Sequence, residues 1–112
     1  MTPLKIVETR PGNFSLLLNA GSAPADVVVD ELGHEPNGYF WEGVAQLLVA
    51  TEAPDLDGRF KYDPEGGMFC AYGEDRPALE QLGALMAAVA NDPERMRAVV
   101  GLAEERGVEF DD

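Results

Sequence analysis

The alternation of hydrophobic and polar positions along the chain predicts two β-hairpins. Strand-like runs rich in apolar and β-branched residues occupy 4–9 and 14–19, and a second pair occupies 60–63 and 68–72. Turn-forming residues, among them proline and glycine, separate the two members of each pair. Three consecutive leucines at 16–18 predict that the second strand is covered on both of its faces.

Apolar residues recur at spacings of three and four in the remaining segments, which predicts helices. In chain order, these segments are 22–33, 39–53, 77–90 and 93–106. Asp75 and Asp92 stand where N-cap residues are expected, each shortly before a proline that suits a first helical turn. Gly43 falls inside the second segment, where glycine costs about 1 kcal/mol relative to alanine. A close approach by another stretch of backbone would explain this glycine.

The order of elements predicts an α+β fold formed by one domain over residues 1–112. We expect one antiparallel sheet built from the two hairpins, with the helices packed on a single face of it. The pattern leaves open whether residues 108–110 add a short final strand.

Composition and charge exclude several classes of function for this protein. The chain is 46% hydrophobic, and its 8 lysines and arginines against 21 aspartates and glutamates give a formal charge of −13. This charge has the wrong sign for binding nucleic acid or an anionic membrane surface. It suits steering toward a basic protein partner, and it equally suits solubility alone. No apolar run is long enough to span a membrane or to serve as a signal peptide, so we expect a cytoplasmic protein.

The residues available for catalysis or metal binding are few. The sole histidine, His34, is interpreted as a surface loop residue, and the sole cysteine, Cys70, as a small buried hydrophobe. Residues 55–58 begin like a calcium loop but lack its third acid and its closing glutamate. Gly66 and Gly67 fit a hairpin turn better than a phosphate loop. We therefore expect no enzymatic activity, no metal and no cofactor.

Three adjacent aromatic residues open the second predicted helix. Successive helical residues are separated by about 100°, so Tyr39, Phe40 and Trp41 cannot all face one core. Phe40 continues the apolar stripe of the helix, and Tyr39 is the residue best placed to reach the rim. The trio either fastens the helices to the sheet or supplies an anchor for a protein partner.

The sequence resembles the bacterial immunity protein 51 family. The resemblance rests on GYFWEGVAQLL at 38–48, DPEGGMFCAYGED at 63–75 and LEQLGALM at 79–86, and it extends from about residue 26 to the end of the chain. It implies an α+β antidote of a polymorphic toxin system, which binds a cognate toxin domain and neutralises it. Toxins of this family's members vary, so the resemblance does not identify the toxin.

Charge and aromatic content together predict where the partner binds. If the toxin is basic, as many nucleases are, carboxylates around the second hairpin are the candidate contact surface, with tyrosines beside them. These candidates are Asp55, Asp57, Tyr62, Asp63, Glu65, Tyr72, Glu74, Asp75 and Tyr39. A small acidic secretion chaperone that holds an effector protein is the alternative, and a small hydrolase is a weaker one. Whether the protein is a monomer or a homodimer stays open.

Overall fold

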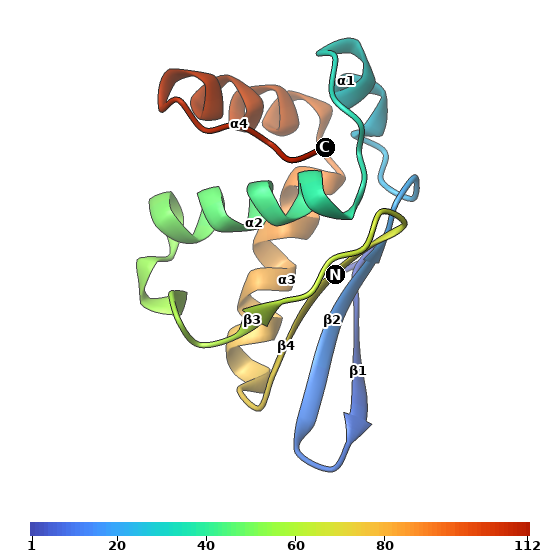
Figure 1. Ribbon diagram of the computed structural model, residues 1–112, viewed down its shortest axis with the longest axis vertical. Helices are drawn as coiled ribbons and strands as arrows, with labels where there is room; N and C mark the ends of the chain where they lie inside the picture. The colour runs from blue at the N-terminus through green and yellow to red at the C-terminus, as the bar shows by residue number, and fades with distance from the viewer.

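The computed structural model describes residues 1–112, and its elements follow the predicted order (Figure 1). The elements are β1 Lys5–Arg10, β2 Asn13–Asn19, α1 Asp26–Glu31, α2 Gly38–Glu52, the 3-10 turn η1 Pro54–Leu56, β3 Lys61–Tyr62, β4 Met68–Gly73, α3 Arg76–Ala90 and α4 Pro93–Glu105. Four antiparallel strands in one open sheet together with four helices confirm the predicted α+β class.

The sheet has the order β1-β2-β4-β3, so the two hairpins are joined through β2 and β4. Alternate residues of β2 and β4 face the helices and are buried there, among them Leu16, Leu18 and Phe69. Leu17 pairs with Lys5 on one side and Cys70 on the other, and all three point to the opposite face. The prediction that β2 is covered on both faces is therefore wrong, because no helix packs on that side and Leu17 remains partly exposed.

The helices lie on one side of the sheet, as predicted. α3 packs against β1, β2 and β4, and α2 lies beside it against β4. α1 and α4 pack together at the end of the molecule that is uppermost in Figure 1. A single cluster of 29 buried residues fills the space between these elements. None of the helices is long and apolar enough to cross a membrane.

The aromatic residues at the start of α2 divide as the helical period predicts. Phe40 and Trp41 are fully buried, whereas Tyr39 retains 40% of its exposure. The Asn37 side chain caps the helix by accepting a hydrogen bond from the Phe40 N–H at 2.9 Å. α2 therefore presents one aromatic ring to solvent and fastens the other two in the core.

The C-terminal segment does not form a strand. Gly107 adopts a φ of +70°, which ends α4, and the Val108 N–H then donates to the Ala103 carbonyl at 2.8 Å. Residues after this turn run back along α2 without pairing to the sheet (Figure 1). The open question about residues 108–110 is thus settled against a strand, since a side-chain contact of Phe110 on α2 fixes this segment instead.

Candidate partner-binding surface

The second hairpin separates the predicted contact residues onto two faces of the molecule. Its register pairs Tyr62 with Ala71 and Lys61 with Tyr72. Paired residues share a face and neighbouring residues alternate, so the two tyrosines point in opposite directions. Residues that are close in the sequence therefore contribute to two separate surfaces.

The first surface is a groove beside α2. Tyr62 and Asp57 lie in it, together with residues from the second half of α2 and from η1. The groove has a volume of about 370 Å³ and is lined by Gln46, Val49, Ala50, Pro54, Asp57 and Tyr62. We call it the α2 groove. The Tyr62 ring is held in place by edge and tilted contacts with Phe60 and Phe69, at centroid distances of 5.6 and 6.1 Å.

Negative charge surrounds the α2 groove. Burial, with the nearby carboxylates of Glu42 and Asp57 as further causes, raises the pKa of Tyr62 to about 12. Burial also raises the pKa of Glu42, and the charge of Asp111 adds to this effect. No lysine or arginine forms an ion pair with any of these three carboxylates. These carboxylates therefore create a field at the groove that favours a cation.

Tyr39 and Glu42 extend this surface along α2. With Gln46 and Ala50 they recur at helical spacing and form the outward stripe of the helix. A smaller hollow of about 150 Å³ flanks the same stripe on its other side. It is lined by Gly43, Gln46, Leu47, Ala50, Arg106 and Val108. One continuous surface thus joins three of the predicted residues, Tyr39, Asp57 and Tyr62, with Glu42, which the sequence analysis did not single out.

The second surface is the uncovered face of the sheet. Asp63 and Tyr72 lie there beside Cys70, in a hollow of about 220 Å³ that Arg10 also lines. An adjoining hollow of about 330 Å³ brings Tyr72 together with Glu74 and with basic residues of the β3 region. This face mixes both signs of charge, and it carries most of the positive charge that is free of carboxylate partners.

Asp75, Glu65 and Asp55, the remaining predicted contact residues, are not among the residues that line these hollows. Asp75 caps α3 by accepting from the Ala78 N–H at 3.1 Å, and it pairs with Arg59 at 2.8 Å. This pairing holds the pKa of Asp75 below its ordinary value, with the hydrogen bond from Arg59 as the largest cause. Glu65 lies in the β3–β4 turn, and Asp55 is exposed on η1. Asp75 therefore has a structural role of its own.

Cys70 is only partly buried, which corrects the expectation of a core residue. Its position in β4 turns the side chain toward the uncovered face, where Leu17 and Asp63 are neighbours. Burial nevertheless raises the pKa of the thiol, and the charges of Asp63 and Glu65 raise it further. At neutral pH the side chain is thus a thiol and not the nucleophilic thiolate. No group of three or more histidine, cysteine, aspartate or glutamate side chains comes together at metal-binding distance.

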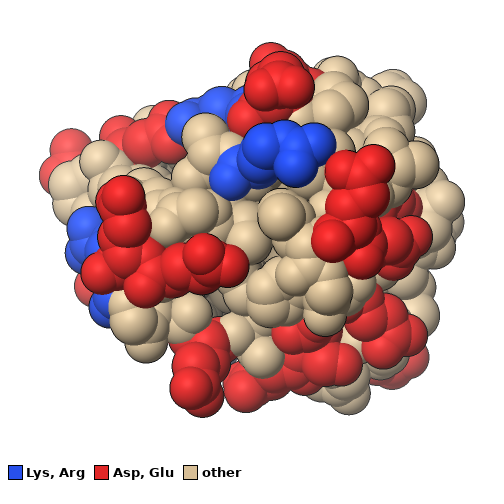
Figure 2. Space-filling view, turned by 90° about the horizontal axis from the view of Figure 1, so that it is seen from above, with Lys and Arg blue, Asp and Glu red and all other residues tan.

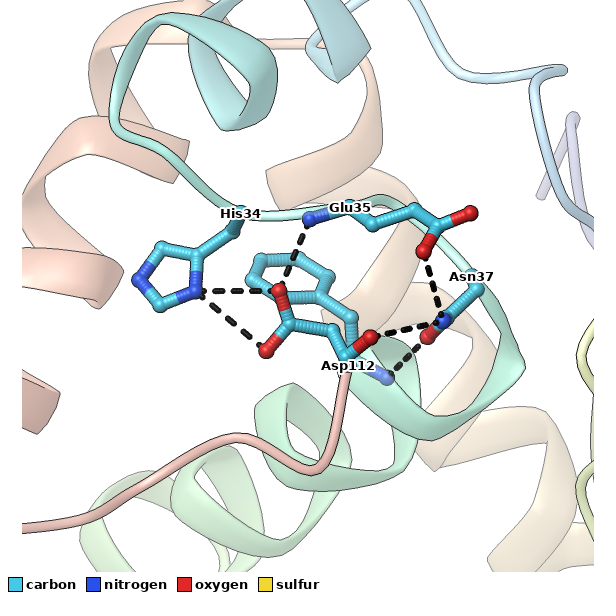
Figure 3. Close-up of polar contacts among 5 residues, drawn as sticks. His34, Glu35, Asn37 and Asp112 are labelled. Carbon is cyan, nitrogen blue, oxygen red and sulfur yellow. Dashed lines mark hydrogen bonds and ion pairs between the residues drawn. The ribbon is translucent and has the colours of Figure 1, made fainter.

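His34 lies in the loop between α1 and α2, as predicted, but it is packed against other residues there. Its ring is partly buried against Phe40 and Phe110, and its Nδ1 lies 3.2 Å from a carboxylate oxygen of Asp112 (Figure 3). The same carboxylate accepts from the Glu35 N–H at 2.8 Å, while the Asn37 side chain donates to the Asp112 backbone carbonyl at 3.4 Å. These contacts clasp the C-terminal segment onto the loop that precedes α2. Gly43 was the only sequence signal for this segment, and the group that approaches it is the Phe110 ring and not the stretch of backbone that we expected.

Acidic side chains dominate the end of the molecule where α1 and α4 lie. Figure 2 shows carboxylates around much of this face and basic groups in only a few places. Only four of the 21 acidic side chains pair with a lysine or arginine, and the partners are Asp75, Glu80, Glu52 and Glu31. Most carboxylates therefore have no lysine or arginine partner, and the net charge of the chain is −13.

Aromatic and apolar walls under a charged rim, as in the α2 groove, have the anatomy of a surface that binds another protein. A family model described as Immunity protein 51 matches residues 4–105. The chain therefore belongs to the immunity protein 51 family, as the sequence resemblance indicated. The match begins earlier than that resemblance, at residue 4, and ends before the clasped C-terminal segment. No curated protein and no solved structure matches the chain.

Proposed function

We propose that the protein binds a cognate toxin domain and neutralises it by protein–protein contact. Membership of an immunity protein family is the observation that carries this proposal. The finer claim is that the toxin is basic, as a nuclease-type domain would be. The large excess of carboxylates without a basic partner supports that claim, because such a surface attracts positive charge and speeds encounter.

Neutralisation requires that the bound protein cover the toxin's catalytic surface or hold the toxin in an inactive form. A basic toxin that acts on nucleic acid uses its positive surface to hold the phosphate backbone. An acidic protein docked on that surface competes directly with the substrate. The candidate contact residues on the α2 side, Tyr39, Asp57 and Tyr62, offer aromatic anchors together with the required charge.

Coexpression tests this function. If a neighbouring gene encodes a large secreted protein, its C-terminal domain is expressed in a sensitive host, with and without this protein. We expect growth to be lost with the toxin alone and restored by coexpression. We also expect a complex of the two folded chains that survives gel filtration. A toxic domain that is neither bound nor neutralised contradicts the pairing, and a dimer of this protein that holds an unfolded effector would identify a secretion chaperone instead.

A further inference from the structure

We propose that the α2 groove receives an arginine side chain of the toxin, with the guanidinium placed over the Tyr62 ring between Glu42 and Asp57. This inference rests on the proposed function, because it names the group by which that toxin is held. The walls of the groove come from Val49, Ala50 and Pro54, which suit the aliphatic part of a long side chain. The charged end of such a side chain then reaches Asp57, which lines the groove, in the field of the nearby Glu42.

The chemistry of the groove selects arginine among basic side chains. A guanidinium is planar, stacks on an aromatic face and donates through a rigid fork that matches a carboxylate, whereas an ammonium is compact and strongly hydrated. Tyr62 supplies an aromatic ring whose position is fixed by Phe60 and Phe69. Asp57 lines the same groove, and Glu42 is close enough for its charge to act on the Tyr62 hydroxyl.

The distribution of positive charge distinguishes this groove from the uncovered face of the sheet. Four of the eight lysines and arginines form no ion pair, and three of those four belong to the strands. Lys5 and Lys61 point to the uncovered face, and Arg10 lines the hollow there. A basic partner would meet like charge on that side. The fourth, Arg106, lines the smaller hollow on the other side of the α2 stripe, whereas the α2 groove itself has no basic residue in its lining and combines Asp57 with the Tyr62 ring.

The first test needs no toxin. An acetylated triarginine peptide is titrated into the 15N-labelled protein, and the amide shifts are followed by NMR. We expect the largest shifts at Gln46, Ala50 and Tyr62. We expect them to be lost in the E42Q/D57N variant, which removes two charges with little change of shape. The matched control, D30N/E94Q, removes two exposed carboxylates from α1 and α4 that form no ion pair, and it should keep the shifts. Shifts that spread evenly over all acidic regions, or that survive in E42Q/D57N, overturn the inference.

The second test uses the toxin domain itself. We expect E42Q/D57N to weaken toxin binding about tenfold or more, mainly through faster dissociation, because a desolvated charge pair is lost. The control D30N/E94Q should change the dissociation rate by less than about twofold, since these two carboxylates lie outside the groove and exposed charges act mainly on association. Equal affinities of the two variants would overturn the arginine site while leaving the proposed function intact. Failure of the unmodified protein to bind any toxin would contradict the proposed function instead. The peptide titration would still show whether the α2 groove binds arginine.

Discussion

At the scale of single residues, Gly43 and Phe110 form a matched pair across the C-terminal clasp. A Cβ added to Gly43 would lie 2.5 Å from the Phe110 ring, which is already in contact with Phe40 at a centroid distance of 4.6 Å. We therefore expect Gly43→Ala to lower the free energy of unfolding by about 1–2 kcal/mol, despite its gain in helix propensity. In a Phe110→Ala background the same change should raise it by up to about 1 kcal/mol. Urea unfolding of the four proteins measures both effects.

A second helical glycine provides the control for this reversal of sign. Gly101 in α4 has nothing within 4 Å of an added Cβ, so Gly101→Ala should stabilise the protein by up to about 1 kcal/mol in both backgrounds. If Gly43→Ala stabilised the unmodified protein as Gly101→Ala does, the Phe110 ring would not be seated on α2. The sign of the change in unfolding free energy, more than its size, tests the contact between Phe110 and α2.

The residues that the sequence placed correctly are those whose surroundings are local. Tyr39, Phe40 and Trp41 follow from the helical period alone, because their neighbours lie within a few turns of the same helix. The contacts of His34 were missed because its partners, Phe110 and Asp112, are more than 70 residues away. No local pattern encodes such a contact, and only the cost of a glycine within a helix indicated that something approaches α2.

At the scale of elements, the Asp75 cap makes the start of α3 sensitive to acid. Because Arg59 and the Ala78 N–H hold the pKa of Asp75 below its ordinary value of 3.8, the folded protein prefers the ionised carboxylate. Its contribution to stability is therefore present above that value and is lost as pH falls through the lowered pKa. Asp75→Asn keeps a capping oxygen but cannot titrate. We expect this variant to be less stable than the unmodified protein at neutral pH and to lose its disadvantage in acid, as measured by thermal unfolding across pH.

Asp26 at the start of α1 provides the opposite case. Burial is the largest cause that raises its pKa, so its ionised form opposes folding, and the penalty is relieved as pH falls through the raised pKa. The stability difference between the unmodified protein and Asp26→Asn should thus move in the opposite direction with pH. If the stability differences of Asp75→Asn and Asp26→Asn from the unmodified protein changed with pH in the same direction, the surroundings described for the two carboxylates would be contradicted.

The elements themselves were largely predictable, and their assembly was less so. Strand alternation, helical spacing and the caps at Asp75 and Asp92 gave the order and class of the elements. The strand register was not predictable, because it depends on pairing between segments distant in the chain. That register places Tyr62 and Tyr72 on opposite faces, which is why a candidate surface that was continuous in sequence separates in space. It also brings Tyr62 within range of the charge of Glu42 on α2, a proximity that neither segment indicates alone.

At the scale of the whole molecule, the charge of −13 acts on folding and on binding in opposite ways. Unneutralised carboxylates repel one another within the folded chain, and the same field attracts a basic partner from a distance. Screening by salt reduces both effects, because the Debye length falls to about 10 Å at 0.1 M ionic strength. Salt therefore distinguishes the two explanations of the acidity, solubility alone or steering of a partner.

We expect a rise from about 20 to about 300 mM NaCl to raise the thermal unfolding midpoint of the isolated protein and to slow its association with the toxin about tenfold or more. Calorimetry measures the first effect, and stopped-flow mixing at each salt concentration measures the second. The dissociation rate should change much less, because groups desolvated in the complex are poorly screened. An association rate that is independent of salt, alongside a stability that rises with it, would assign the acidity to solubility alone. If the association rate falls with salt while the stability of the isolated protein rises, the acidic surface speeds capture of the partner. The repulsion among its carboxylates is then the cost in folding stability of that faster capture.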